Sequence, residues 1–251
     1  MDRDMDSLYI IIPAYNESEN IGNVIEEWYP VIERHSGEGK SRLVILDDGS
    51  RDDTLDIAKS YVARLEYLET ITRENSGHGA TIYFGYQYAI ESGADFIFQT
   101  DSDGQTLASE FEAMWNDRYD SDVIIGDRTN RQDGVSRRFV SGCLRHLVEM
   151  IFSVKIPDTN TPYRLMSRHA LQTAIEYIPS EYSLTNVGLT AVCAGMASGK
   201  AGEDKRISLR FMPITFRPRQ GGRNSINIVK IAGLGLKATG ELIGIRNKLY
   251  T

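Results

Sequence analysis

The stretch Leu43-Val-Ile-Leu-Asp-Asp-Gly-Ser-Arg-Asp-Asp-Thr54 decides the fold class. Its four apolar residues predict a short buried strand, and the acidic, glycine-containing turn after them ends it. Ser50, Asp52 or Asp53 can cap a helix that runs from this turn to about Leu65. A buried strand that leads through a short loop into a helix is the building unit of parallel α/β sheets.

The same unit repeats on both sides of this stretch. Before it, Leu8–Ile12 predicts a strand that ends at Pro13, and a helix follows over about 18–34. After it, strands are predicted at 67–72, 96–100 and 123–125, with a helix at 79–92. The less regular second half predicts helices at 137–154 and 185–196, short strands within 156–165 and 208–216, and a helix from 226 to the end. We therefore expect an α/β fold whose mostly parallel sheet is flanked by helices.

The predicted organisation is a single domain over residues 1–226, followed by a C-terminal helical segment over 227–251. With 251 residues, of which 41% are hydrophobic, the chain can bury a sizeable core. Within the domain, residues 1–128 form one half and residues 129–226 the other. Charge follows nearly the same division, because residues 1–127 hold 27 acidic and 9 basic residues, whereas residues 128–251 hold 8 and 19. An acidic half suits cation ligands and a basic half suits phosphates or anionic lipid, although two differently charged solvated faces would give the same counts.

Composition also argues against several classes of protein. Two cysteines do not make a disulfide scaffold or a cysteine-based zinc cluster, and four histidines do not favour a histidine-rich metal site. The acidic first residues and the lack of a long apolar run predict neither a secretory signal nor a spanning helix. We expect a cytoplasmic protein, or one at the inner face of the cytoplasmic membrane, that binds no nucleic acid.

Three predicted loops follow strands and carry polar groups, namely 13–17, 47–54 and 101–105. Ligands of open α/β sheets bind at the carboxyl ends of the strands, so these loops are the candidate site. Asp101 and Asp103 stand two residues apart at a strand end, with Gln105 beyond them. Oxygen ligands in this pattern suit Mg²⁺ or Mn²⁺ together with phosphate oxygens, whereas an isolated D-x-D triplet is also typical of a solvated turn.

The other two loops and one helix start suit a nucleotide. A carboxylate in Asp47-Asp48 can accept a hydrogen bond from the donor edge of a uracil or guanine base, or it can cap a helix. Tyr15 can stack on a base and Glu17 can hold a ribose hydroxyl, or the loop can simply end a strand. The N–H groups in Asn75-Ser-Gly-His-Gly79 can face a diphosphate or form a structural glycine turn. The glycine spacing matches neither a dinucleotide fingerprint nor a P-loop.

In their order along the chain, these motifs resemble family 2 glycosyltransferases with the GT-A fold. The matching pieces are Ile10-Ile-Ile-Pro-Ala-Tyr-Asn-Glu17, Leu46-Asp-Asp-Gly-Ser-Arg-Asp-Asp-Thr54, Asn75-Ser-Gly-His-Gly79 and Thr100-Asp-Ser-Asp-Gly-Gln105. The second half is similar to the polyprenyl-phosphate branch typified by dolichol-phosphate mannose synthases. It matches through Gly126-Asp-Arg128, Ser136-Arg-Arg138, Asp158-Thr-Asn-Thr-Pro-Tyr-Arg-Leu165 and Pro213-Ile-Thr-Phe-Arg-Pro-Arg-Gln-Gly-Gly-Arg-Asn-Ser225.

The resemblance implies a role for each matched position. The nucleotide-sugar site would contain Pro13, Ala14, Tyr15, Glu17, Asp48, His78, Asp101 and Gln105. The metal, Mg²⁺ or Mn²⁺, would be held by Asp101, Asp103 and Gln105. Donor or acceptor phosphates would meet Arg128, Arg137, Arg219, Arg223 and Ser225, and the catalytic group would be Asp103, Asp158 and Arg137. His78 stands where relatives often have Lys or Arg, and the loop from Arg219 to Ser225 is one residue longer than the usual pattern.

The implied reaction is transfer of a sugar, with inversion, from a UDP- or GDP-sugar to a polyprenyl phosphate. A sugar hydroxyl acceptor needs a carboxylate base, and the stretch Glu181-Tyr-Ser-Leu-Thr-Asn-Val-Gly188 lacks the Glu-Asp pair of many hydroxyl-acceptor relatives. A polyprenyl phosphate is already an anion and needs cationic residues instead. The C-terminal segment can lie on an anionic membrane or pack on its own domain. Two alternatives stay open: transfer to a saccharide hydroxyl of a cell-surface glycan, and a nucleotide-sugar binding protein without catalysis.

Overall fold

The computed structural model describes residues 5–128, 135–219 and 228–251, and it describes side chains for 5–128, 141–219 and 238–251. A single seven-stranded sheet runs through the molecule in the order β3-β2-β1-β4-β6-β5-β7. Its strands are β1 (Leu8–Ala14), β2 (Arg42–Asp47), β3 (Leu68–Thr72), β4 (Phe96–Gln99), β5 (Val123–Asp127), β6 (Arg164–Ser167) and β7 (Leu209–Pro213). Strand β6 pairs antiparallel with β4 and β5, and the other pairs are parallel. The expectation of a mostly parallel α/β sheet is confirmed.

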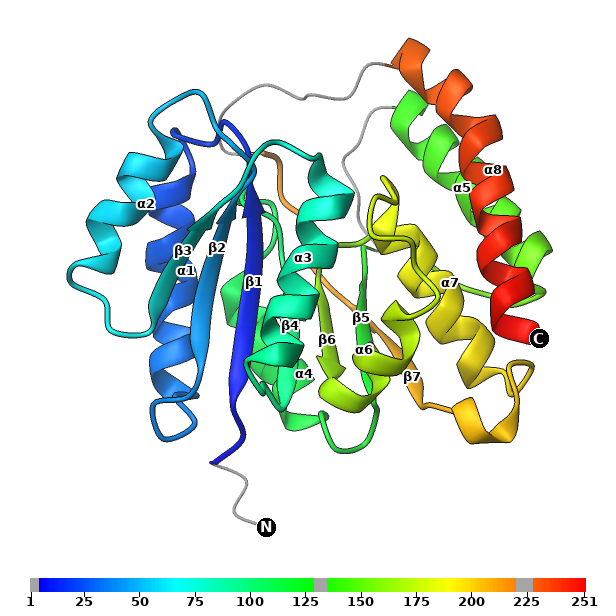
Figure 1. Ribbon diagram of the computed structural model, residues 1–251, viewed down its shortest axis with the longest axis horizontal. Coiled ribbons are helices and arrows are strands. Elements are labelled where there is room, and N and C mark those ends of the chain that lie inside the picture. The colour runs from blue at the N-terminus through cyan, green and yellow to red at the C-terminus, as the bar shows by residue number, and fades with distance from the viewer. Residues whose placement is uncertain (1–4, 129–134, 220–227) are drawn as a thin grey trace.

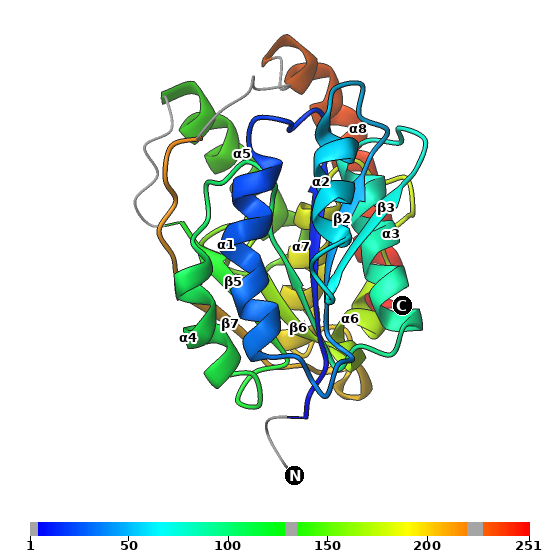
Figure 2. The same cartoon turned by 90° about the vertical axis from the view of Figure 1, so that its left-hand side faces the viewer.

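Helices cover both faces of the sheet (Figures 1 and 2). One face carries α1 (Ile21–Arg34), α2 (Thr54–Val62) and α4 (Phe111–Asn116). The other carries α3 (His78–Glu91), α5 (Val135–Phe152), α6 (Arg168–Ile175), α7 (Thr185–Ala197) and α8 (Ile228–Tyr250). Two short 3₁₀ turns, Ala108–Glu110 and Glu203–Lys205, lie between these elements.

Strand β1 shows why the sequence needs two helical layers. Its side chains alternate, so Leu8, Ile10 and Ile12 pack beneath α1, whereas Tyr9 and Ile11 pack against α3. Every residue of β1 is buried. A central strand of a sheet covered on both faces is apolar throughout, and the run of isoleucines meets that requirement.

The sequence prediction placed the end of β1 two residues too early, because the strand continues through Pro13 to Ala14. The backbone explains the difference. Ile11 O accepts from Thr100 N (3.2 Å) on the β4 side, so the alternating backbone turns Pro13 toward β4 as well. The pairing of β4 with β1 ends at Ile11 and Gln99, so the N–H that proline lacks has no partner to lose.

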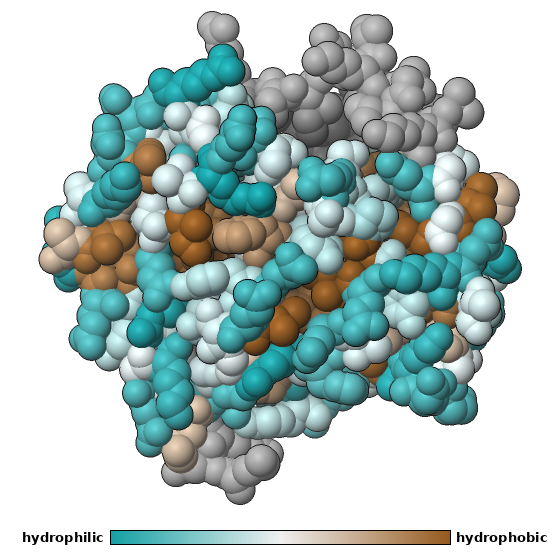
Figure 3. Space-filling model, in the orientation of Figure 1, coloured by the Kyte–Doolittle hydropathy of each residue, from teal (hydrophilic) through white to brown (hydrophobic). Residues whose placement is uncertain are grey.

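The other predicted elements are present with boundaries shifted by a few residues, and two short helices, α4 and α6, were not predicted. Helix α6 begins at a local cap, where Ala170 N donates to Ser167 Oγ (3.3 Å). Helices α5 and α8 contact each other, and the C-terminal part of α8 packs on the core through Ala238, Leu242, Ile245 and Leu249. Across the described residues, none of the helices is both long and apolar enough to cross a bilayer. Figure 3 shows one face of the molecule, where hydrophilic side chains predominate and apolar patches lie between them.

Candidate active site

The loops after β1, β2 and β4 meet at one end of the sheet, drawn at the top of Figure 1. Backbone and hydroxyl contacts join the first two loops. Asp48 N donates to Ala14 O (2.9 Å), and Glu17 N donates to Thr54 Oγ1 (2.7 Å). Pro13 and Ala14 are buried, whereas Tyr15 is 38% exposed and accessible to a ligand. The sequence prediction that these loops form one surface agrees with this geometry.

Asp48 organises the loop that precedes α3. Its buried carboxylate accepts hydrogen bonds from Ser76 N (2.8 Å), Gly77 N (3.0 Å) and Asn75 Nδ2 (3.2 Å). Gly77 has φ +89°, a conformation that favours glycine. The sequence offered base recognition or a helix cap for this carboxylate, and the structure adds a third task, which is to fix the start of α3.

Asp47 and Asp52 stabilise the turn between β2 and α2 through hydrogen bonds. Asp47 Oδ1 accepts from Ser50 N (3.1 Å), and its Oδ2 accepts from Thr72 Oγ1 (2.7 Å). Asp52 accepts from Thr54 N (3.1 Å) at the start of α2, so of the three predicted caps it is Asp52 that binds the first turn. Burial raises the pKa of Asp52, but the hydrogen bonds from Thr54 and Ser18 outweigh it and hold the pKa below its ordinary value.

Asp101 and Asp103 stand close together at the end of β4 with too little positive charge around them. Burial first, and then repulsion from Asp101, raise the pKa of Asp103 to about 6. Asp101 Oδ1 is buried and accepts no hydrogen bond from any residue that the structure describes, and His78 Nε2 lies 3.7 Å from it. Two oxygen donors in this condition fit a divalent cation, which would supply the missing positive charge.

Gln105 ties loop 101–105, the predicted metal loop, to the segment after β7. Its backbone N–H donates to Asp103 Oδ1 (3.1 Å), and its side-chain Nε2 donates to Arg217 O (3.0 Å). Arg217 Nε donates in turn to Gly104 O (2.6 Å), and its guanidinium pairs with Glu27 of α1. Within the described residues no hydrogen bond is seen to the amide oxygen of Gln105, which suits the predicted metal role.

Arg219 bridges two predicted site residues. It pairs with Glu17, and its Nη1 lies 3.8 Å from Asp103 Oδ2. Glu17 Oε2 also accepts from Asn20 Nδ2 (2.7 Å), so the carboxylate is held from both sides. The structure thus brings a basic residue of the second half to the acidic loops of the first half.

Asp158 and Arg128 lie at the carboxyl end of β5 and form a buried, bidentate ion pair. Arg128 Nε donates to Asp158 Oδ2 (2.6 Å), and Nη2 donates to Oδ1 (2.8 Å). The side chains are 6% and 8% exposed. Sequence analysis assigned Arg128 to phosphate binding and Asp158 to catalysis, and it did not predict that they bind each other. A carboxylate neutralised in this way is a poor general base.

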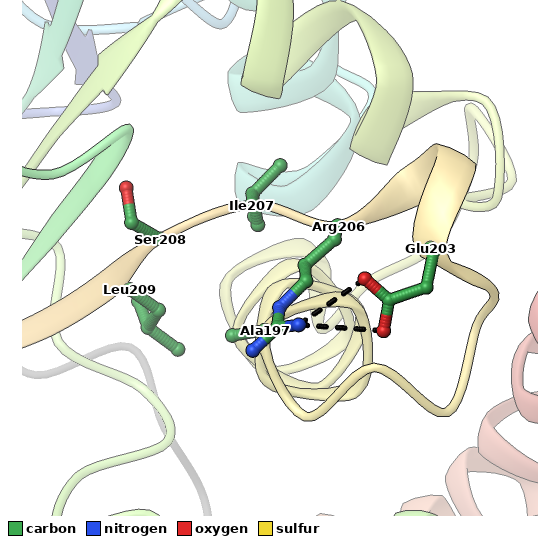
Figure 4. Close-up of a pocket in the computed structure, with 6 residues that line it drawn as sticks. All are labelled: Ala197, Glu203, Arg206, Ile207, Ser208 and Leu209. Carbon is green, nitrogen blue, oxygen red and sulfur yellow. Dashed lines mark hydrogen bonds and ion pairs between the residues drawn. The ribbon is translucent and has the colours of Figure 1, made fainter.

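Three predicted residues cannot be placed by their side chains. Arg223 and Ser225 lie outside the described residues, and Arg137 lies in the part of α5 whose side chains are not described. A separate hollow of about 480 Å³ lies beside the amino end of β7, lined by Ala197, Glu203, Arg206, Ile207, Ser208 and Leu209 (Figure 4). It is at the opposite end of the sheet from the acidic loops and includes none of the predicted site residues.

Comparison with known proteins identifies the family and the fold. The model of glycosyl transferase family 2 matches residues 9–174, which contain the acidic loops and the Arg128–Asp158 pair. The chain belongs to this family. Its fold is also that of glucosyl-3-phosphoglycerate synthase from Mycobacterium tuberculosis, with a TM-score of 0.67 at 16% identity, over 96% of this chain and 80% of the other. The expected GT-A fold is therefore confirmed.

Two curated family members act on lipid phosphates by name. A dolichyl-phosphate beta-glucosyltransferase, ALG5C of Trichomonas vaginalis, is 24% identical over 176 residues, covering 64% of this chain and 51% of the relative. A dodecaprenyl-phosphate galacturonate synthase of Rhizobium johnstonii is 28% identical over 159 residues, covering 60% and 45%. The chain spans about half the length of these relatives. The resemblance to the polyprenyl-phosphate branch is thereby confirmed.

Proposed function

We propose that this family 2 member is a metal-dependent inverting glycosyltransferase that moves a sugar from a UDP- or GDP-sugar to a polyprenyl phosphate. The observation that carries the proposal is the under-neutralised pair Asp101 and Asp103 at the end of β4, beside the loops predicted for the nucleotide. Mg²⁺ or Mn²⁺ would be held there by Asp101, Asp103 and Gln105. When bound, the cation neutralises the diphosphate that leaves the sugar.

The donor would lie across the joined loops. Tyr15 is exposed enough to stack on a base, and Pro13 and Ala14 form the floor beneath it. Asp48 would read the base while its hydrogen bonds keep the loop before α3 in place. His78, at the first turn of α3, would face the diphosphate, whose charge suits the amino end of a helix.

The geometry around Asp158 favours a phosphate acceptor. A hydroxyl acceptor needs a base to take its proton, and Asp158 is already neutralised by Arg128. A lipid phosphate is ionised before it binds and needs positive charge. Arg137, Arg219, Arg223 and Ser225 are the proposed phosphate contacts, with Arg219 next to the donor loop. Arg128, which the resemblance also assigned to phosphate, is already paired with Asp158. Direct displacement on an α-linked donor would yield a β-linked product.

A lipid acceptor implies contact with a membrane, and we place the protein at its cytoplasmic face. The described part of α8 buries Leu242, Ile245 and Leu249 in its own domain, which favours the packed-helix interpretation for that part. Ile243 points away from the core and is 45% exposed. Deleting the whole segment would disturb the core, so Ile243→Asn is the better probe. Reduced sedimentation of this variant with anionic liposomes would support membrane contact through this surface. Unchanged sedimentation would rule out membrane contact through it.

The proposed function is tested by one transfer assay. The protein is incubated with Mn²⁺ or Mg²⁺, a panel of labelled UDP- and GDP-sugars and a polyprenyl phosphate, and the label extracted into organic solvent is counted. We expect metal-dependent label in the lipid phase that identifies the donor. Asp103→Asn should abolish it, and Asp120→Asn, an exposed carboxylate far from the site, should not.

Two other outcomes of this assay would each favour one of the two alternative functions. Metal-dependent release of nucleotide without label in the lipid phase would indicate a hydroxyl acceptor. Metal-dependent binding of UDP or GDP without turnover across the panel would indicate a binding protein.

A further inference from the structure

Polar atoms without partners gather behind the metal loop. Within the described residues, eight buried side-chain nitrogen or oxygen atoms lack a hydrogen-bond partner. Four of them lie around the carboxyl end of β4, where Arg164 stands opposite Gln99 and donates to Asn186: Gln99 Nε2, Asp101 Oδ1, Arg164 Nε and Asn186 Oδ1. Natural proteins leave few buried polar groups unsatisfied, and such a concentration calls for a functional explanation.

Arg164 is the charged member of this group and is completely buried. It stands opposite Gln99 in the β4–β6 ladder. Its Nη1 donates to Asn186 O (3.3 Å) at the start of α7, and its Nη2 donates to Thr161 O (2.5 Å) in the segment that carries Asp158. No carboxylate among the described residues is hydrogen-bonded to it. A buried guanidinium without opposite charge costs several kcal/mol, so a negative charge close by must offset it.

Asp101 is the carboxylate in position to do so. Tyr86 is buried behind the same strand and its hydroxyl donates to Gln99 Oε1. Burial raises the pKa of Tyr86, the charge of Arg164 lowers it, and the charge of Asp101 raises it. The register of the sheet brings the two residues near each other, because Arg164 stands opposite Gln99 and Asp101 follows two residues after Gln99. Asp101 Oδ1 and Arg164 Nε are both buried and lack a hydrogen bond within the described residues, and the basic side chain beside Asp101 Oδ1 there is His78, at 3.7 Å.

We propose that Arg164 is a positioning residue, whose guanidinium holds the start of α7 and the Asp158 segment behind the metal loop and offsets the charge of Asp101 from the interior. The inference rests on the proposed function, because it concerns how the metal loop is supported. The proposal predicts that a substitution strengthens metal binding instead of weakening it. Arg164 repels any cation bound at Asp101, so removing its charge should tighten binding of the metal while misplacing the groups that carry out transfer.

The test compares Arg164→Met with the unmodified protein in two measurements. Binding of Mn²⁺ alone is followed by electron paramagnetic resonance of the free ion, and transfer kinetics are measured with the donor found above. We expect Mn²⁺ to bind roughly 3- to 10-fold more tightly. We expect kcat to fall roughly 10- to 100-fold, with the donor KM changed by less than about 3-fold. Arg164→Lys keeps the charge but not the fork, so it should lower kcat and leave Mn²⁺ affinity as in the unmodified protein.

Arg118→Met is the matched control. Arg118 is a buried arginine that donates to a backbone carbonyl, Trp115 O (2.9 Å), and pairs with Asp6 at the amino end of the sheet. The Arg118→Met variant should be less stable than the unmodified protein and should not bind Mn²⁺ more tightly. Should Arg164→Met fail to fold, Arg164→Gln replaces it, since its amide can still donate to one of the two carbonyls.

Unchanged or weaker Mn²⁺ binding in the folded neutral variant would overturn the proposal and leave Arg164 a packing residue. Failure of the proposed function is a separate result, because then the unmodified protein itself would neither bind Mn²⁺ with a nucleotide nor transfer sugar.

Discussion

Two buried carboxylate sites at the same end of the sheet are built in opposite ways. At the end of β4, Asp103 lies beside Asp101, and the nearest cation to Asp103 within the described residues is Arg219, 3.8 Å away. At the end of β5, Asp158 is neutralised by two hydrogen bonds of 2.6 and 2.8 Å from Arg128. The protein neutralises the second site itself, whereas the proposed cation would offset the charge of the first.

This difference separates a binding site from a structural pair. A buried ion pair with bidentate geometry is satisfied without a ligand, and breaking it leaves an unpaired charge. Two adjacent buried carboxylates repel each other until a proton or a cation neutralises part of their charge. The two sites should therefore respond to the same kind of substitution in opposite ways.

The largest expected effect is on stability, at the β5 site. Asp158→Asn leaves Arg128 buried and unpaired, so the free energy of unfolding should fall by about 3–5 kcal/mol in urea denaturation. Arg128→Met combined with Asp158→Met removes both charges and should recover most of the loss. A single variant as stable as the unmodified protein, yet inactive in transfer, would instead return Asp158 to the catalytic role suggested by its sequence motif.

The next effect is on activity, at the β4 site. Asp103→Asn removes a proposed metal ligand and should lower metal-dependent transfer by about 100-fold or more. Because it also removes repulsion with Asp101, the thermal midpoint of the metal-free protein should not fall. A variant that is both inactive and strongly destabilised would show that Asp103 is structural, like Asp158.

A smaller effect concerns pH. The pKa of Asp103 is raised to about 6, so the folded state binds a proton more tightly than the unfolded state. Stability of the metal-free protein should therefore rise as pH falls from 7 toward 5, by about 1–2 kcal/mol at most after solvent screening. Urea denaturation in the presence of EDTA measures this rise in the free energy of unfolding. The rise should be absent in Asp103→Asn. Saturating Mn²⁺ should remove it in the unmodified protein, since the bound cation takes the place of the proton.

Sequence reasoning succeeds where chemistry is local. The apolar runs predicted the strands, and Asp101 and Asp103 were found because they directly follow one. Contacts between distant segments were not predictable. Nothing in the spacing of Arg128 and Asp158, 30 residues apart, tells that they pair with each other rather than with ligands.

Arg164 shows the same limit more sharply. Its hydrogen-bond partners among the described residues are backbone carbonyls, which leave no trace in residue types. The motif that contains it was matched to a family, but its burial could only come from the register of β6 against β4. The end of β1 was misplaced for a related reason, because a proline is tolerated or not according to which neighbour its nitrogen faces.

The smallest expected effect concerns Gln105, which can anchor the loop, bind the proposed metal, or do both. Its Nε2 donates to Arg217 O (3.0 Å), while its oxygen, which accepts no hydrogen bond from the part of the chain that is described, is proposed for the metal. Gln105→Met should lower the free energy of unfolding by about 1 kcal/mol through the lost hydrogen bond. Mn²⁺ affinity, measured by paramagnetic resonance, should weaken by less than about 10-fold, because the two carboxylates stay in place. A loss of affinity as large as in Asp103→Asn would make the amide a principal ligand, and no change in affinity would confine Gln105 to anchoring the loop.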